Sequence, residues 1–193
     1  DQSSVGGFAG RIIGSGDVNI TVKSVSVSGS VTGPNAGGFV GKTGEVVFGN
    51  PGSIVKIMNS DSNVDVTADG RKAGGFVGFA KSGTQLINLT ATGDVTSPDA
   101  GGFVGKAEGD VTIKDSSASG NANGETLAGG FAAYLDGGDI TISDSYATGD
   151  ASSTGFSGGF IAASRLSVNE INSSYSTGSV DGETAGGFIG NVR

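Results

Sequence analysis

Histidine, cysteine and tryptophan are absent from this chain of 193 residues, and proline occurs only three times. Without cysteine there are no disulfides, no thiolate nucleophiles and no thiolate metal sites. Without histidine the chain lacks the commonest general base and the commonest ligand for transition metals. The sequence therefore predicts a chain that is not an enzyme, with no catalytic residues and no cofactor or metal site.

Positive charge and long apolar runs are also scarce. Eleven Lys and Arg residues stand against nineteen Asp and Glu, which gives a net charge of −8, and the basic residues form no cluster along the chain. This balance disfavours nucleic acid as a partner. No stretch of about 18 apolar residues occurs, so we expect no insertion into a membrane. Because the chain begins at Asp1 and carries no signal peptide, we expect a mature or excised segment of a larger protein.

Glycine, by contrast, accounts for 38 residues, about a fifth of the chain and far above the usual ~7%. Much of it belongs to a Gly-Gly-Phe triplet that recurs at intervals of 31, 37, 27, 28, 29 and 28 residues. The phenylalanines are Phe8, Phe39, Phe76, Phe103, Phe131, Phe160 and Phe188. A period in this range indicates stacked units, each of which buries its apolar face against its neighbours.

One repeat shows what each unit is. Val111 and Ile113 alternate with polar neighbours, as in a half-buried strand, whereas Ser116 and Ala118 alternate on the other parity. The chain must therefore turn a corner between Ile113 and Ser116. With Gly-Gly-Phe-Val as a third extended segment, each unit predicts one coil of a parallel β-helix (β-solenoid) with three short strands. We expect an all-β single domain over residues 1–193, of about six coils with about 28 residues each, whose handedness stays open.

Equivalent positions of the repeats form columns. Three columns are expected to face inward, and they read Val25, Ser60, Leu89, Ser116, Ser145, Ser174; then Val27, Ser62, Ala91, Ala118, Ala147, Ser176; then Val31, Val66, Val95, Ala122, Ala151, Val180. Between the last two lies a column of Gly29, Val64, Gly93, Gly120, Gly149 and Gly178. Glycine there predicts a corner at which φ is positive or a side chain does not fit. The small inward residues leave room for a stacked ladder of phenylalanines, each stabilising by roughly 1.5–3 kcal/mol through burial.

The second interval contains about nine extra residues. Residues 45–53 are rich in turn formers, and we expect an inserted loop there. Loops on solenoids often bind ligands, and an insertion packed on the side of the coil is the alternative.

Several repeats resemble the GLUG repeat of bacterial surface and secreted proteins. The closest copies are 101–111 for the first half of the motif, and 144–150 and 173–180 for the second. The resemblance covers nearly the whole chain. This chain has Phe where the family commonly has Leu, and two units replace the second glycine region with Ala132-Ala133 and Ala162-Ala163.

The resemblance implies a β-helical segment of an exported bacterial protein, extracellular or at the cell surface. Such proteins include adhesins, filamentous-haemagglutinin-like exoproteins and the repeat regions of immunoglobulin A metallopeptidases. The expected function is structural or adhesive. The expected partners are a host or cell-surface ligand, protein or glycan, and flanking repeats or domains of the same chain. The alternatives are a carbohydrate-binding or carbohydrate-processing β-helix and an ice-binding solenoid.

Acidic residues offer two further possibilities. Asp17, Asp94, Asp110, Asp139 and Asp150 follow glycine in turns, where they either bind calcium or are simply solvated. Coils also bring distant carboxylates together, as glycoside hydrolysis requires. No grouping of Arg, aromatic and acidic residues along the chain marks a sugar-cleaving groove.

One outward column consists of small polar residues, namely Ser28, Asn63, Thr92, Ser119, Thr148 and Thr177. A flat rank of this kind is typical of ice-binding solenoids, and it is equally an ordinary polar sheet face, because Thr favours strands. In the neighbouring outward column Tyr146 and Tyr175 lie on successive coils. They form either an aromatic patch for a ligand or a stabilising cross-strand pair.

Overall fold

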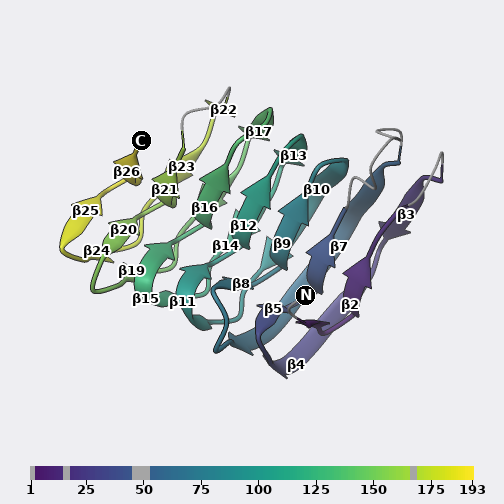
Figure 1. Cartoon of the computed structure of the whole chain (residues 1–193), viewed down its shortest axis with the longest axis horizontal. Helices are drawn as coiled ribbons and strands as arrows, with labels where there is room; N and C mark the ends of the chain where they lie inside the picture. The colour runs from purple at the N-terminus through teal and green to yellow at the C-terminus, as the bar shows by residue number, and fades with distance from the viewer. Residues whose placement is uncertain (1–2, 15–17, 45–52, 166–168) are drawn as a thin grey trace.

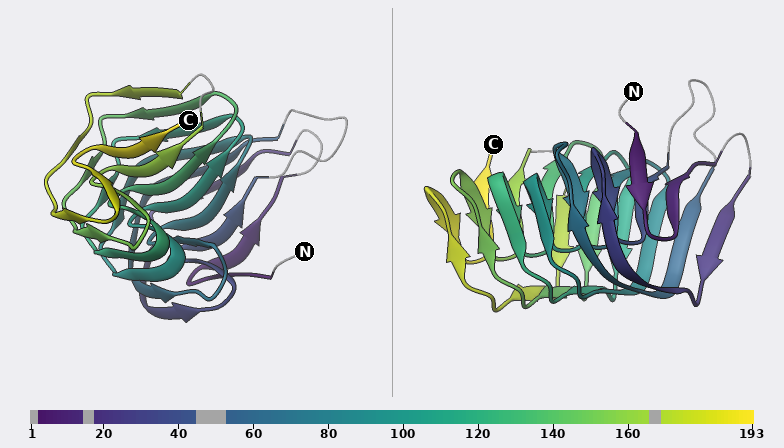
Figure 2. Two further views of the ribbon diagram at one scale, coloured as in Figure 1. Left: turned by 60° about the vertical axis from the view of Figure 1, so that its left-hand side comes forward. Right: turned by 90° about the horizontal axis from the view of Figure 1, so that it is seen from below.

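The computed structural model describes residues 3–14, 18–44, 53–165 and 169–193. All regular structure in these ranges is β-strand, and none of it is a helix that could cross a membrane. The chain winds as a stack of parallel coils, with the first and last coils at opposite ends (Figures 1 and 2). The predicted all-β parallel solenoid of about six coils is confirmed.

Each coil contributes strands to two parallel sheets. The smaller sheet contains only the strands that follow Gly-Gly-Phe: β2 (Ala9–Ile12), β6 (Val40–Thr43), β9 (Val77–Lys81), β12 (Val104–Glu108), β16 (Ala132–Asp136), β21 (Ile161–Ser164) and β26 (Ile189–Val192). We call its outer surface the second face.

The larger sheet folds around the rest of each coil. The strands that end in Gly are β1 (Ser4–Gly6), β5 (Asn35–Gly37), β8 (Lys72–Gly74), β11 (Val95–Gly101), β15 (Ala122–Gly129), β20 (Phe156–Gly158) and β25 (Thr184–Gly186). The strands with the Val/Ile pattern are β3 (Ile20–Lys23), β7 (Val55–Thr67), β10 (Thr84–Ala91), β13 (Val111–Lys114), β17 (Ile140–Ser143) and β22 (Asn169–Asn172). The short strands beyond the next corner are β4 (Ser26–Thr32), β14 (Ser117–Ala118), β18 (Tyr146–Ala147), β19 (Ala151–Ser152), β23 (Tyr175–Ser176) and β24 (Val180–Asp181).

The predicted corner between Ile113 and Ser116 is present, and one residue makes it. Asp115 has a φ of 51°, in the left-handed region. The equivalent residues of the other coils, Ser24, Asn59, Asn88, Asp144 and Ser173, have φ values between 47° and 57°. Asn and Asp tolerate this conformation better than other residues with a side chain. A single residue in the left-handed conformation in each coil therefore causes the change in which alternate residues face inward.

A ladder of phenylalanine rings runs along the inside of the stack, as predicted. Consecutive rings lie 4.6 to 5.3 Å apart between centroids. The five internal members Phe39, Phe76, Phe103, Phe131 and Phe160 are fully buried, whereas Phe8 at the end is 45% exposed. The ladder packs against the Val/Ile strands in one continuous core.

The three inward columns are confirmed in register. The serine column has a further role that the sequence did not reveal. The Ser116 hydroxyl donates to the Lys114 carbonyl at 2.8 Å, across the corner, and accepts from the Leu89 backbone N–H of the preceding coil at 3.3 Å. Ser145 repeats both bonds. These hydroxyls satisfy the backbone groups that the left-handed corner removes from the strand ladder.

Close contact with the neighbouring coil explains why glycine is needed at every glycine of this column except one. Only Gly29 has a positive φ, of 123°. A Cβ on Gly93, Gly120, Gly149 or Gly178 would overlap a carbonyl oxygen of the preceding coil. At Val64 the corner is altered as expected, because β7 continues through it as one strand.

The predicted inserted loop falls mostly on residues 45–52, which lie outside the described residues.

The two ends of the stack are expected to associate. In the described part of the chain, β2 pairs only with β6 and β26 pairs only with β21, so each end presents an open strand edge beside a partly exposed phenylalanine. Open parallel edges are templates for further strand pairing. We expect end-to-end association at high concentration in analytical ultracentrifugation, and faster amide exchange in the terminal coils than around Phe103. A strictly monomeric chain with uniform protection would contradict this.

Candidate functional site

A column of basic and aromatic side chains runs along the second face. Each occupies the position three residues after a ladder phenylalanine, and strand pairing places them in register. The column reads Arg11, Lys42, Phe79, Lys106, Tyr134, Ala163 and Asn191. In β12, Lys106 and Glu108 are partly exposed on either side of buried Ala107, which shows the alternation that turns the column outward.

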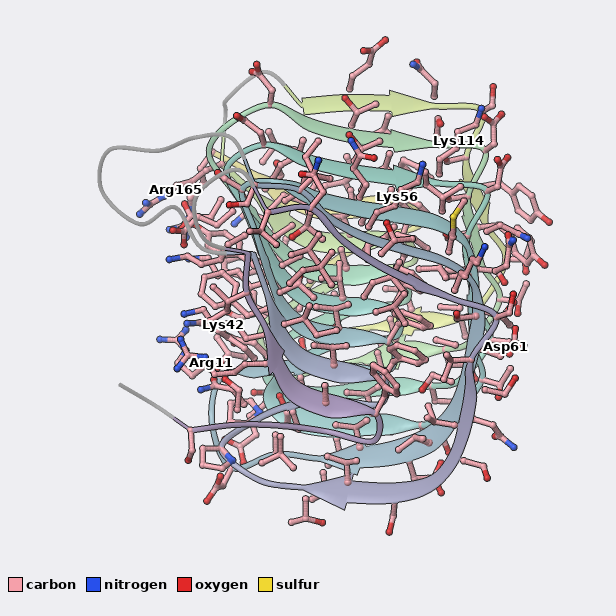
Figure 3. All side chains as sticks on the ribbon, turned by 90° about the vertical axis from the view of Figure 1, so that its right-hand side faces the viewer. Arg11, Lys42, Lys56, Asp61, Lys114 and Arg165 are labelled. Atoms are coloured by element: carbon pink, nitrogen blue, oxygen red, sulfur yellow. The ribbon has the colours of Figure 1, made fainter. Side chains whose placement is uncertain are left out.

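Basic residues concentrate on this face. Of the eleven Lys and Arg residues, eight lie in the column or beside it: Arg11, Lys42, Arg71, Lys72, Lys81, Lys106, Arg165 and Arg193. Figure 3 shows Arg11, Lys42 and Arg165 along one side of the molecule, with Lys56 and Lys114 on a different wall. The chain is acidic as a whole, but its positive charge is gathered on one face.

Phe79 is the centre of a lysine cluster. Four ammonium groups lie near its ring centroid, Lys72 at 4.1 Å, Lys81 at 5.3 Å, Lys106 at 5.4 Å and Lys42 at 5.9 Å. Phe79 itself is only 8% exposed. Cations near an aromatic face interact favourably with its quadrupole. Burial is the main cause that lowers the pKa of Lys72, and repulsion from the nearby ammonium group of Lys106 lowers it further.

An ion-pair chain crosses the middle of the face. Lys106 Nζ lies 2.6 Å from Asp136 Oδ2 and 2.8 Å from Glu108 Oε2. Lys81 extends the chain at Glu108, and Arg165 extends it at Asp136. Burial acts to lower the pKa of Lys106, but its hydrogen bonds to Asp136 and Glu108 outweigh this effect, so the pKa is raised. The network fixes the Lys106 ammonium beside the Tyr134 ring, 5.7 Å from its centroid.

Next to this network the face is hollowed. One depression, of about 350 Å³, is lined by Arg71, Asp99, Thr126, Leu127, Tyr134, Phe156, Ala163, Ser164, Arg165, Asn191 and Arg193. A second, of about 250 Å³, is lined by Arg71, Lys72, Asp99, Gly105, Lys106 and Tyr134. Because Arg71, Asp99 and Tyr134 line both, we treat them as one groove and call it the Tyr134 groove.

Arg71 and Asp99 meet in the Tyr134 groove. Arg71 Nε donates to Asp99 Oδ2 at 3.1 Å, while the Arg71 side chain is 70% exposed. Asp99 is almost fully buried, and its second oxygen, Oδ1, has no hydrogen-bond partner. Burial raises the pKa of Asp99, and the nearby Arg71 opposes that rise. The pair therefore combines an exposed guanidinium with a buried carboxylate, of which one oxygen accepts from Arg71 and the other has no donor.

Sequence reasoning missed this groove and found no site residues. Arg, aromatic and acidic residues do not group along the sequence, but in three dimensions one depression is lined by Arg71, Asp99, Tyr134, Phe156 and Arg165. These residues come from four coils, since only Phe156 and Arg165 share one, so their separation in sequence hides their proximity. The one available signal was the position three residues after each ladder phenylalanine, which carries Arg, Lys, Phe, Lys and Tyr in successive units.

The acids of the Gly-Asp turns connect coils. Asp94 Oδ1 accepts the Asn121 backbone N–H at 2.8 Å, and Asp150 Oδ1 accepts that of Ser179 at 2.7 Å. Asp110 is placed similarly toward the Asp139 N–H at 3.4 Å. Asp17 lies outside the described residues, and within them no three potential metal-ligating side chains come together. The carboxylates of Asp94, Asp110 and Asp150 thus each accept a backbone N–H of another coil.

Calcium is expected to leave the stability of the chain unchanged. A carboxylate that already accepts a backbone N–H from the next coil has only part of its coordination capacity left, and Ca²⁺ requires six to eight oxygen ligands. Thermal unfolding followed by circular dichroism should give the same midpoint with millimolar calcium and with a chelator. A clear rise of the midpoint in calcium would instead assign the turns as cation sites.

The outward columns lie as predicted. Tyr146 and Tyr175 stack with centroids 5.1 Å apart and planes at 5°, so they form the cross-strand pair, and both rings are also exposed. All members of the Ser/Thr column are exposed. Thr92 donates to Asn63 across coils at 3.0 Å, which makes part of the column a coil-to-coil contact.

No protein family, curated protein or solved structure matches the chain.

Proposed function

We propose that this chain is a non-catalytic structural and adhesive β-helix segment of an exported bacterial surface protein. The observation that carries the proposal is the use made of the recurring side chains. The Phe ladder, the Ser hydroxyls and the Asp carboxylates each contact the next coil. Residues that recur along the repeats thus hold successive coils together along the axis, as in a rod that displays its outer surface. The resemblance of the repeats to the GLUG motif supports a place at the cell surface.

Carbohydrate binding is the second candidate, and the Tyr134 groove favours it. Ligand sites are concave, mostly apolar and furnished with a few well-placed polar groups. Hydrolysis of a glycan by the usual mechanism needs two carboxyl groups that flank the scissile bond. Among the described residues that line this groove, Asp99 is the single carboxylate. The groove therefore suits retention of a sugar better than its cleavage.

Retention and turnover can be measured together. Beads coated with the chain should be held under flow on surfaces that carry bacterial or host polysaccharides, whereas beads coated with albumin should wash off. The same polysaccharides, incubated with soluble chain, should show no new reducing ends. New reducing ends would overturn the proposal in favour of a carbohydrate-processing enzyme. Failure of the beads to adhere to any surface would remove the adhesive role.

A further inference from the structure

We propose that the Tyr134 groove binds an acidic glycan, with the carboxylate of a hexuronic acid on Arg71 and its ring against Tyr134 and Phe156. The proposal rests on the adhesive function above and names the ligand class. Three independent features of the groove carry it: its charge, the geometry of Arg71 and the nature of the remaining lining residues.

The excess of basic residues on the second face favours an anionic ligand. Eight of the eleven basic residues lie on it, and four of the eight share ion pairs with three carboxylates, so basic residues are in excess on this face. Asp99 pairs with Arg71, Glu108 pairs with Lys106 and Lys81, and Asp136 pairs with Lys106 and Arg165. A cleft in which one sign of charge predominates concentrates ligands of the opposite sign. Since the whole chain is at −8, the second face is where an anionic partner meets the least repulsion.

Arg71 is held ready for a carboxylate. Its Nε is bound to Asp99, which orients the guanidinium plane, and the side chain otherwise projects into solvent at the groove. The two Nη groups form the opposite edge of that plane. Two parallel N–H donors match the two oxygens of a carboxylate, and such bidentate pairs are the stronger and more specific form of this contact.

The other lining residues favour a sugar over a simple anion. Tyr134, Phe156 and Leu127 provide apolar surface beside the basic groups. The C–H face of a pyranose ring suits the negative face of an aromatic ring. Asp99 Oδ1 is too buried to contact a ligand in the groove. A sulfate or phosphate ion has no apolar face to place against the two rings, whereas a pyranose has one. Thr126 and Asn191 add further polar groups at the rim.

The groove accommodates more than one sugar unit. It crosses the coils from Lys106 to Asn191, which is three coil intervals in the strand register. Neighbouring strands lie ~4.8 Å apart, so the groove covers roughly 15 Å. Basic residues occur at both ends of this span, Lys72 and Lys106 at one and Arg193 at the other, with Arg165 one coil before it. An oligosaccharide with successive carboxylates would therefore meet a cation along most of its length.

The test uses trigalacturonate as the probe and isothermal titration calorimetry with the whole chain. We expect binding that weakens as salt is raised, because the contact is ionic. The methyl-esterified trisaccharide keeps the rings and loses the charge, and it should bind at least about tenfold more weakly, or about 1.4 kcal/mol. A polyglutamate peptide of equal charge should not compete at the same concentration.

Matched variants locate the site. Arg71→Lys retains a positive charge opposite Asp99 but loses the fork, and it should weaken binding about tenfold. Tyr134→Ala should weaken it similarly. Lys114→Gln and Tyr175→Ala remove a cation and an exposed ring from other walls, and each should change the affinity less than about twofold. If the circular dichroism spectrum of Arg71→Lys shows that this variant is unfolded, then the affinity of Tyr134→Ala and the affinity of the methyl ester test the proposal.

Each other outcome contradicts the proposal. Equal binding of the methyl ester excludes the carboxylate contact, and equal competition by polyglutamate assigns the groove to an acidic peptide. Unchanged affinity in Tyr134→Ala places the sugar elsewhere, and no binding of trigalacturonate removes the ligand class. These failures leave the non-catalytic rod untouched. Cleavage of trigalacturonate would overturn the proposed function instead, whatever the affinity.

Discussion

Replacing Phe103 by Ala is expected to lower the free energy of unfolding by about 3–5 kcal/mol. Phe103 stacks between Phe76, at 5.3 Å, and Phe131, at 4.7 Å, and its ring is fully buried. Truncation removes the buried area and leaves a cavity between two rigid coils that cannot collapse onto it, because backbone hydrogen bonds fix their separation. Urea unfolding followed by circular dichroism measures the loss.

Phe8→Ala is the matched control for Phe103→Ala. It removes the same side chain from the end of the ladder, where the ring is 45% exposed and stacks on one neighbour only. We expect roughly half the effect or less, because less area is transferred to water. A loss below about 1 kcal/mol for Phe103→Ala would show that the ladder is not the main core. Equal losses at both sites would show that coil position is irrelevant.

Gly102→Ala is expected to destabilise the chain by about 3 kcal/mol or more, although it adds a single methyl group. A Cβ at Gly102 would overlap the carbonyl oxygen of Gly130 in the next coil. Neither group can yield easily, since the Gly130 N–H is itself bonded to Gly158 at 3.0 Å. The substitution must force two hydrogen-bonded coils apart. Thermal and urea unfolding of the variant measure the cost.

Gly187→Ala provides the control, because the triplet Gly186-Gly-Phe188 is the last of the seven. Gly187 occupies the position of Gly102, but a Cβ there meets no atom within 4 Å. We expect a change within about 0.5 kcal/mol of the unsubstituted chain. If the two substitutions cost the same, then glycine is present for a reason other than contact between coils, and the steric explanation of the repeat is wrong.

The fold was predictable because its interactions repeat. The buried ring of Phe103 stacks on a ring in the adjacent coil, and the equivalent position of each coil is also phenylalanine. The core residues therefore recur in the sequence at a regular interval. The inward columns follow for the same reason, since strand register places Ala91, Ala118 and Ala147 directly above one another. The left-handed corner residue was not identified, because Ser, Asn and Asp at that position are also common in turns without this conformation.

The groove was not predictable, because it does not repeat. Arg71 and Asp99 are not part of a repeating pattern. They lie in neighbouring coils, and the strand register brings their side chains into contact. Nothing in the spacing of 28 residues between them distinguishes a paired Arg and Asp from two solvated side chains. The concentration of lysines around Phe79 is hidden in the same way, since its four members come from four segments of the chain.

The sequence by itself determined the architecture: an all-β stack of coils with a phenylalanine ladder, because a parallel solenoid imposes the same local requirement on every unit, and a periodic requirement leaves a periodic sequence. Only the tertiary structure decided where the charge gathers, which acids connect coils and which side chains share a groove. Those features depend on the sideways register of strands far apart in sequence, and on the direction in which each outward side chain points. They place Arg71, Asp99 and Tyr134 together from three separate coils.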